Sequence, residues 1–233
     1  MPKRMNKTKK TKRRGYRRRR TRQGYNQSSN DARVLAFTQA SPLPKNFKAT
    51  QIYSDPFISL TASGAGVPAS RVYSCNGLFD PDITGVGHQC SGFDQLMTMF
   101  DHYCVIGARI SVTFTNFSTD FPMLCCVDIR DSPTTTTDYR EAIESGTCKS
   151  ALVSVSNSGA STATIVYNVN PAKFLGRSKP LADPDLKGSA SANPVEQCYF
   201  HVIIAGDGAE KVGASITIEY ISMFIEPKPV GLS

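Results

Sequence analysis

The sequence predicts an all-β protein: an eight-stranded antiparallel jelly roll of two packed sheets, preceded by a basic N-terminal arm that we expect to be disordered. Three observations support this fold class. Thr, Ser, Val and Ile are plentiful and Trp is absent, a composition that favours strands. Eight segments have strand-like patterns without strand–helix–strand alternation. Their connections are unequal and often long, which suits a double Greek key better than the alternative, an immunoglobulin-like sandwich.

The first thirty residues differ in charge from the rest of the chain. They hold 13 Lys or Arg and no acid, and the whole chain holds 27 basic and 19 acidic residues. The remainder therefore has 27 − 13 = 14 basic against 19 acidic residues, so the net charge of +8 is +13 on the arm and −5 elsewhere. We expect three parts: the arm over 1–30, an extended transition over 31–46, and a single jelly-roll domain over 47–228. The arm has too few apolar residues to offset the entropy of ordering its backbone.

A block of positive charge this dense, without acids, indicates a polyanion as partner, and nucleic acid above all. Arginine suits bidentate phosphate contacts, and Tyr16 and Tyr25 could stack on unpaired bases. No pattern in the arm reads base sequence, and a solvated tail or a nuclear-import signal is the simpler alternative. Import by receptors is also compatible with nucleic-acid binding, because the same residues can serve both. The predicted nucleic-acid-binding residues are Lys3, Arg4, Lys7, Lys9, Lys10, Lys12, Arg13, Arg14, Tyr16, Arg17, Arg18, Arg19, Arg20 and Arg22.

The eight strands follow from apolar residues at alternate positions. A further short strand at 34–37 is conceivable, and Pro56 suggests an edge or a bulge in the first strand. The last strand is apolar on both faces from Tyr220 to Ile225, which predicts a central strand between two packed layers. The expected strands are 47–60, 70–76, 106–115, 121–130, 151–155, 163–169, 198–204 and 216–224.

Two helical insertions interrupt the strands. In the first, Phe93, Leu96, Met97 and Phe100 have the spacing of one helix face, and Ser91 with Asp94 marks a start. The second covers 138–144, where Asp138 and Glu141 have the spacing of a capping-box variant. A long loop is expected over 171–194, between two prolines.

Catalytic and metal motifs are weak, and we expect neither an enzyme nor a cofactor. The three histidines have no nucleophile partner at a recognised spacing, and His201 is predicted on the polar face of a strand. His88, Cys90, His102 and Cys104 are of zinc-binding type, but their spacing matches no known finger.

Asp80 and Asp82 flank Pro81 and could bind Ca²⁺ at a subunit contact, although turn formation by Asp-Pro-Asp explains them more simply. The seven cysteines are odd in number and mostly lie in strand-like runs, so we read them as buried free thiols rather than disulfides.

A membrane partner is not expected. The chain has no apolar run of about 18 residues, and no lipidation motif or secretory signal begins it.

One stretch resembles a known family. Residues 76–95, NGLFDPDITGVGHQCSGFDQ, are similar to a segment in capsid proteins of small circular single-stranded DNA viruses related to circoviruses. The family's Asn-x-Leu-Phe-Asp-Pro-Asp-x-Thr-Gly-x-Gly-His-Gln-Pro run is matched through Gln89, with Cys90 where Pro is usual. The match resumes at Gly92 and continues through Gln95.

The resemblance implies a coat protein that assembles into an icosahedral shell of about sixty copies and packages a single-stranded DNA genome with its arm. It further implies the virion as location, with the host nucleus during assembly. The residues by themselves suit RNA equally well. Two alternatives therefore stay open: a capsid protein of a small RNA virus, and a non-viral nucleic-acid-binding β-sandwich module with a basic tail.

Overall fold

The computed structural model describes residues 42–64 and 66–230, and these form two four-stranded antiparallel sheets. Hydrogen-bonded strand order is β1-β8-β3-β6 in one sheet and β2-β7-β4-β5 in the other. Most strands that are neighbours within a sheet are far apart in the sequence, and most successive strands lie in different sheets. This is the jelly-roll topology. The predicted fold class is confirmed. The strands are β1 (Asn46–Thr61), β2 (Ala69–Ser74), β3 (Phe100–Asn116), β4 (Met123–Arg130), β5 (Lys149–Val153), β6 (Thr162–Val169), β7 (Tyr199–Ala205) and β8 (Lys211–Pro227).

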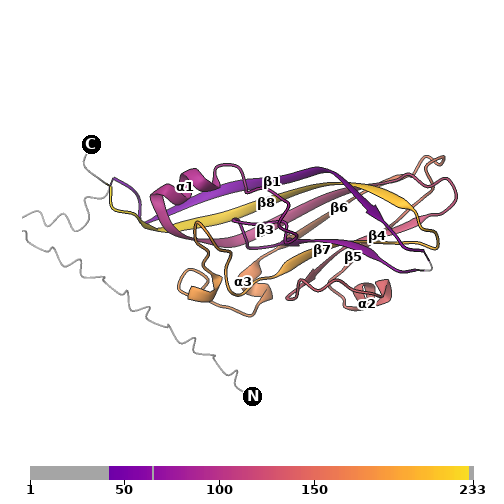
Figure 1. Cartoon of the computed structure of the whole chain (residues 1–233). Coiled ribbons are helices and arrows are strands. Elements are labelled where there is room, and N and C mark those ends of the chain that lie inside the picture. The colour runs from indigo at the N-terminus through magenta and orange to yellow at the C-terminus, as the bar shows by residue number, and fades with distance from the viewer. Residues whose placement is uncertain (1–41, 65, 231–233) are drawn as a thin grey trace, which may run out of the picture. The chain divides into compact units, whose positions relative to one another are not determined.

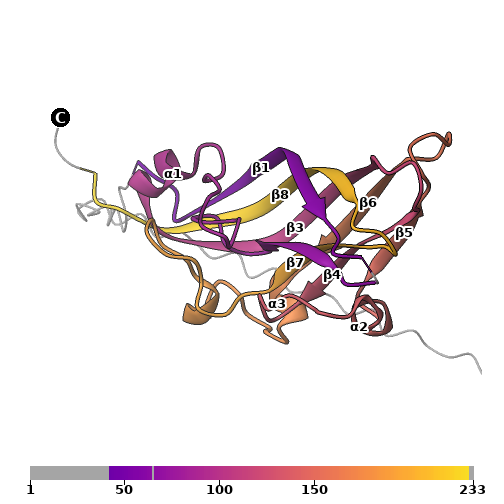
Figure 2. The same cartoon turned by 45° about the vertical axis from the view of Figure 1, so that its right-hand side comes forward.

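The two ends of this sandwich differ in their connections (Figures 1 and 2). Segments 62–68, 117–122, 154–161 and 206–210 make short connections at one end. The long connections 75–99, 131–148 and 170–198 leave the strands at their opposite ends and carry every helix of the described chain. The helix within 75–99 lies at that end, whereas the helix within 131–148 lies beneath the β2-β7-β4-β5 sheet, toward the end with the short connections. The helices are α1 (Phe93–Met99), α2 (Tyr139–Glu144), α3 (Pro171–Phe174) and the 3₁₀ helix η1 (Pro184–Leu186). None of them is long and apolar enough to cross a membrane.

β1 is an edge strand, as Pro56 led us to expect. Among the described strands it pairs only with β8, and the register shifts between Asp55 and Ile58. The extra residue of this bulge lies beside Pro56, which cannot donate a ladder hydrogen bond.

β3 begins at Phe100, six residues before the predicted start at Ile106. The reason is a register shift between Val105 and Gly107. The bulge changes which alternate positions face the core: Tyr103 and Val105 are buried before it, and Ala108 and Ile110 after it. A search for one unbroken alternation therefore finds only the second half of the strand.

The last strand, β8, is central, between β1 and β3. The prediction of two covered faces holds only at the end of this run. Tyr220 and Phe224 are buried in one alternate row, and in the other row Ile225 is buried whereas Ile221 is exposed. The second face is therefore covered near Ile225 and open at Ile221.

The core lies between the two sheets and is closed at the long-loop end by aromatic rings. Phe93 meets Tyr103 edge-on with ring centroids 5.4 Å apart, and Phe100 and Phe224 lie 6.0 Å apart. All four side chains are at most 1% exposed. Burying aromatic side chains of this size contributes strongly to stability, and α1 supplies one of them, so the predicted core-packing role of the 93–100 stripe holds.

The helix starts differ in part from expectation. The N-cap of α1 is Gly92, in the left-handed region at φ 79°, and not Ser91. At α2 the Asp138 side chain accepts a hydrogen bond from Arg140 N, as a cap should. Glu141 instead accepts from Thr136 Oγ1 (2.6 Å), so the reciprocal half of the capping box is not made. The predicted 171–194 loop contains α3 and η1, both too short for a periodic signal.

Candidate functional site

All fourteen predicted nucleic-acid-binding residues lie outside the described residues, as does the conceivable strand at 34–37. The structure therefore informs function through residues 42–230, which we call the body. Between residues 42 and 230 the sequence has 13 basic and 18 acidic side chains, a balance of −5.

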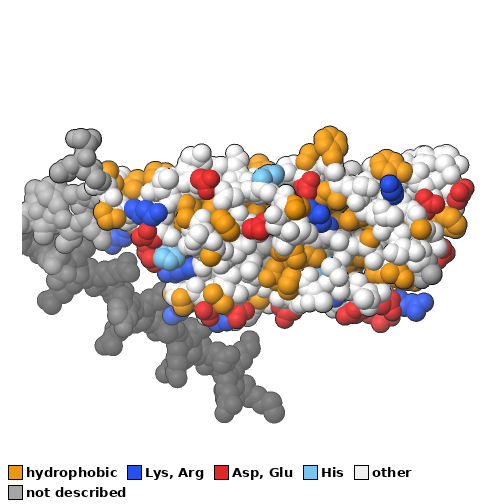
Figure 3. Space-filling view, in the orientation of Figure 1, with side chains coloured by type: hydrophobic (Ala, Val, Ile, Leu, Met, Phe, Trp, Pro, Cys, Tyr) orange, Lys and Arg blue, Asp and Glu red, His pale blue; other side chains and the backbone are white. Residues whose placement is uncertain are grey.

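The arginines of the body are mostly paired with carboxylates. Of the five described arginines, four have a carboxylate oxygen within 4 Å: Arg71, Arg109, Arg130 and Arg177. Arg177 alone reaches Asp183, Asp185 and Glu196. In Figure 3 charged side chains are scattered singly over much of the visible face, and acids gather over α2. A guanidinium already bonded to a carboxylate is a poor phosphate ligand, so these four arginines are poorly placed to bind nucleic acid.

The segment that resembles the viral family, 76–95, is anchored by a side chain far away in sequence. Asn193 Oδ1 accepts hydrogen bonds from Phe79 N and Asp80 N, both at 3.2 Å, and Asn193 Nδ2 donates to Asp80 O at 3.0 Å. The Tyr103 hydroxyl donates to the same Asn193 oxygen. A Cβ on Gly77 would lie 2.6 Å from the Asn193 side chain. This stretch therefore has a structural role: it closes the sandwich at the long-loop end.

Asp82 is fully buried and its two oxygens are used by the protein. Oδ2 pairs with Arg71, and Oδ1 accepts from Thr84 N (3.1 Å) and Thr84 Oγ1 (2.9 Å). The two contacts with Thr84 are those of an Asp side chain that forms a turn, which is the role predicted for Asp-Pro-Asp as the alternative to calcium binding. Burial and the nearby Asp82 charge raise the pKa of Asp80. The calcium site of Asp80 and Asp82 stays a prediction, with Asp82 bound by protein donors.

His88 lies against the ring of Tyr53, with centroids 4.5 Å apart. Its ring nitrogens lie 2.8 Å from Gln89 O and 3.0 Å from Ser54 O. Both partners are carbonyls, so only the doubly protonated ring can donate to both. These backbone acceptors raise the pKa of His88.

The zinc-type set of four is not brought together. Cys90 packs in the main core, Cys104 packs in a separate cluster with Ala172 and Leu186, and His102 pairs with Glu226 (3.0 Å). Across the described residues there is no group of three His, Cys, Asp or Glu placed to hold a metal ion.

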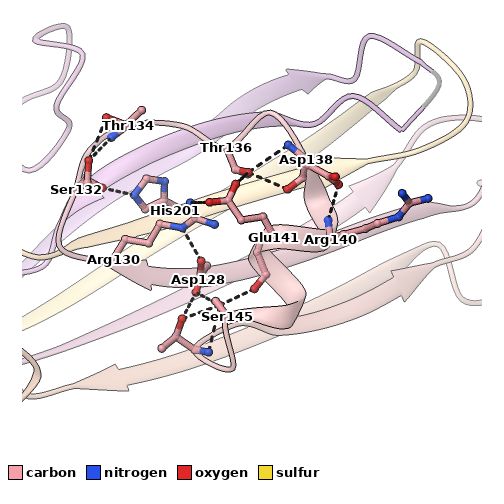
Figure 4. A network of polar contacts seen from close by, with 12 residues as sticks. Asp128, Arg130, Ser132, Thr134, Thr136, Asp138, Arg140, Glu141, Ser145 and His201 are labelled. Carbon is pink, nitrogen blue, oxygen red and sulfur yellow. Dashed lines mark hydrogen bonds and ion pairs between the residues drawn. The ribbon is translucent and has the colours of Figure 1, made fainter.

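A buried polar network supports the connection 131–147 (Figure 4). Asp128, on β4 and fully buried, accepts from Arg130 Nε (2.8 Å) and Thr147 Oγ1 (2.6 Å). Arg130 then reaches Glu141 on α2, with Nη1 3.6 Å from Oε1. Through these contacts, α2 and the end of the 131–147 connection are both linked to β4.

His201 lies on the polar face of β7 that points away from the main core, as predicted, but its side chain is fully buried. It sits opposite Asp128 across the β4–β7 pair, and Nε2 lies 2.8 Å from Ser132 O. Burial lowers the pKa of His201, and the nearby Arg130 guanidinium acts in the same direction. The alternating pattern was right for β7, but this sheet face is covered by the 131–147 connection, so its polar position is not a solvent position.

The cysteines are free thiols, as predicted, and six of the seven are buried. Four of them form two neighbouring pairs. Cys75 and Cys198 lie in the core, and burial raises the pKa of the Cys75 thiol. Cys126 and Cys148 lie beneath α2, where their mutual hydrogen bond raises the pKa of Cys126 and lowers that of Cys148.

Two features of the site were missed by the sequence reasoning. Asn193 carries no local signal, because its partners lie more than a hundred positions away. The outward-facing Phe57 was predicted only as part of the 47–60 strand, and Phe117 lay between two predicted strands; both are exposed. The bulge suggested at Pro56 was the one available hint that a side chain leaves the inward row there.

Comparisons with known proteins found no match among family models or curated proteins. Solved structures gave matches of low identity. One is the cryo-EM structure of Macrobrachium rosenbergii nodavirus semi-empty virus-like particles, at 10% identity and TM-score 0.46, covering 83% of this chain and 100% of that one. A second is the decameric BFDV capsid protein, at 9% identity and TM-score 0.46, covering 78% and 99%. A third is Desmodium yellow mottle tymovirus, at 13% identity and TM-score 0.38, covering 84% and 99%. The jelly-roll assignment for this chain rests on the strand order of its two sheets.

Proposed function

We propose that this chain is a viral coat protein: its jelly-roll body assembles with copies of itself into a small closed shell, and its basic arm binds the packaged genome. One observation carries the proposal. Thirteen basic residues without an acid occupy residues 1–30, while a jelly roll with a charge balance of −5 follows. Such a body does not repel its copies as a strongly basic one would, and the arm can neutralise phosphates.

The charge state of the described surface supports the same division of roles. Four of the five arginines of residues 42–230 are paired with carboxylates. Genome contact is therefore assigned to Lys3 through Arg22, with Tyr16 stacking on bases. The resemblance of residues 76–95 to circovirus-like capsid proteins favours single-stranded DNA as the genome, about sixty copies per shell, and a nuclear stage with import receptors. An RNA genome agrees equally well with the charge pattern.

Imaging of the purified full chain, together with identification of the nuclease-protected polymer, tests this function. Uniform closed particles that protect DNA are expected. Particles that protect RNA would keep the coat-protein function and overturn the choice of genome. A stable monomer in excess nucleic acid would instead support the non-viral β-sandwich module.

A further inference from the structure

The outer face of the β1-β8-β3-β6 sheet has an uncharged hollow of about 370 Å³. It is lined by residues 56–59 of β1, residues 213–215 of β8, Thr113 and Thr115 of β3, and Phe117 just after β3. Its lining contains no charged side chain and exposes mainly apolar atoms. The hollow therefore suits an apolar group and offers no cation to a phosphate.

Two phenylalanines border this hollow and point away from the core. Phe57 is 95% exposed and Phe117 is 61% exposed. Phe57 leaves the inward row because of the bulge between Asp55 and Ile58. The ring of Phe117 lies over Gly213, where a Cβ would approach it to 2.8 Å. The Phe117 ring can therefore pack against β8 because Gly213 has no side chain.

We propose that this face is a contact surface between two copies of the chain, in which Phe57 of each copy enters the hollow beside Phe117 of the other. A two-fold contact requires one surface that carries both a projection and the recess that receives it. This face has both, within residues 56–59 and 113–117. It is also uncharged along the lining, so two identical copies meet there without like-charge repulsion.

The area suits a weak, reversible contact. An aromatic side chain contributes about 150–250 Å², and Phe57 and Phe117 are 95% and 61% exposed, so the two rings from each of two copies bring about 470–780 Å². The walls of the two hollows add to that. The sum approaches the value of about 1,000 Å² at which specific contacts begin, the range of weak and transient interfaces.

The inference deepens the proposed function and rests on it only for the claim that copies associate. Placing a photo-crosslinking p-benzoylphenylalanine at position 57 of the full chain, in high salt after nuclease treatment, tests the contact directly. We expect crosslinks between chains that map by mass spectrometry to residues 113–117 or 213–215. The same group at Val195, which is 82% exposed and outside the hollow, is the matched control and should not reach those residues.

Other outcomes separate this inference from the proposed function. Closed particles whose position-57 crosslinks map elsewhere, including to residues 1–41, would overturn the contact and leave the coat-protein function standing. Paired chains crosslinked at 113–117 but unable to form closed particles would support the contact and contradict the shell. A monomer without crosslinks between chains would overturn both.

The substitutions Phe57→Ser and Phe117→Ser give an independent readout. Each is expected to weaken association by about tenfold or more in sedimentation velocity, since burying a phenyl group is worth enough to change an equilibrium constant by that factor. Val195→Ser, at a similarly exposed apolar position, should leave association unchanged. Circular dichroism confirms the fold of each variant, and unchanged association in folded Phe57→Ser would overturn the contact.

Discussion

At the residue scale, the buried charges of the body are held by few partners. Asp82 has no exposed surface and depends on Arg71 and Thr84, while Asp128 depends on Arg130 and Thr147. A buried carboxylate is costly unless it is paired and hydrogen-bonded. These positions therefore respond to substitution far more than the exposed pairs.

Replacing Arg71 with Met should strongly destabilise the body. It leaves the Asp82 carboxylate buried without its cation, and breaking such a pair costs about 3–5 kcal/mol. Chemical denaturation of the variant measures the loss. Arg109→Met is the control, because Arg109 and Glu219 are each about half exposed and such pairs contribute about 0–1 kcal/mol. Equal losses of unfolding free energy in the two variants would contradict a buried Arg71–Asp82 ion pair.

His201 should make the body sensitive to acid. Burial holds the pKa of His201 below the ordinary 6.5. As the pH falls through 6.5, the histidine therefore binds a proton in the unfolded chain but not in the folded chain. The free energy of unfolding therefore decreases from about pH 7 downward until the lowered folded pKa is passed. We expect His201→Gln to flatten this part of the curve.

The control for that experiment is His88→Gln. The pKa of His88 is raised, so its contribution is present below pH 6.5 and is lost as the pH rises through the folded pKa. Subtracting each variant's unfolding free energies from those of the wild type over pH 5–8 should give curves of opposite slope. Slopes of the same sign would contradict the opposite environments of the two rings.

At the element scale, strand interiors were predictable and connections were not. The alternation in β4, β6 and β7 is local, and the structure has these strands within a few residues of their predicted ranges. The start of β3 was missed because a bulge at 105–107 changes the inward row. The roles of Asn193 and His201 depend on segments that come together only in the folded sandwich.

Asn193 should be the anchor of the 76–95 segment. In Asn193→Ala, Phe79 N and Asp80 N lose their acceptor. These hydrogen bonds are partly buried, so we expect a loss of about 1 kcal/mol, the low end of the cost of unmade buried hydrogen bonds. Hydrogen exchange should accelerate at these two amides beyond any global change. Ser191→Ala, at an exposed position of the same connection, should leave them protected. Unchanged exchange at Phe79 and Asp80 in the Asn193 variant would refute the anchor.

At the scale of the whole molecule, the fold and the division of charge could both be anticipated, because strand count and net charge are sums over many residues. Surfaces could not. An exposed Phe57 and a buried Tyr53 belong to the same strand, and only the bulge and the partner strands decide which side chain faces outward. A nucleic-acid-binding role for residues 1–30 is predicted from charge alone and stays a prediction.

Nucleic-acid binding by the full chain should depend steeply on salt. Thirteen phosphate contacts to a single strand release counterions with a log–log slope of about −9, without preference for sequence. A titration of binding constant against salt with oligonucleotides of two unrelated sequences measures it. A slope near −2, or strong discrimination between the sequences, would contradict a purely electrostatic arm.

The most direct test of the account compares the nucleic acid bound per chain in the full protein and in a protein lacking residues 1–30, with circular dichroism confirming the fold of both. The account predicts that the shortened chain stays β-rich and still associates with its copies, while its bound nucleic acid falls close to zero. A shortened chain that unfolds, or that retains the nucleic acid of the full protein, would contradict the separation of a genome-binding arm from a self-assembling body.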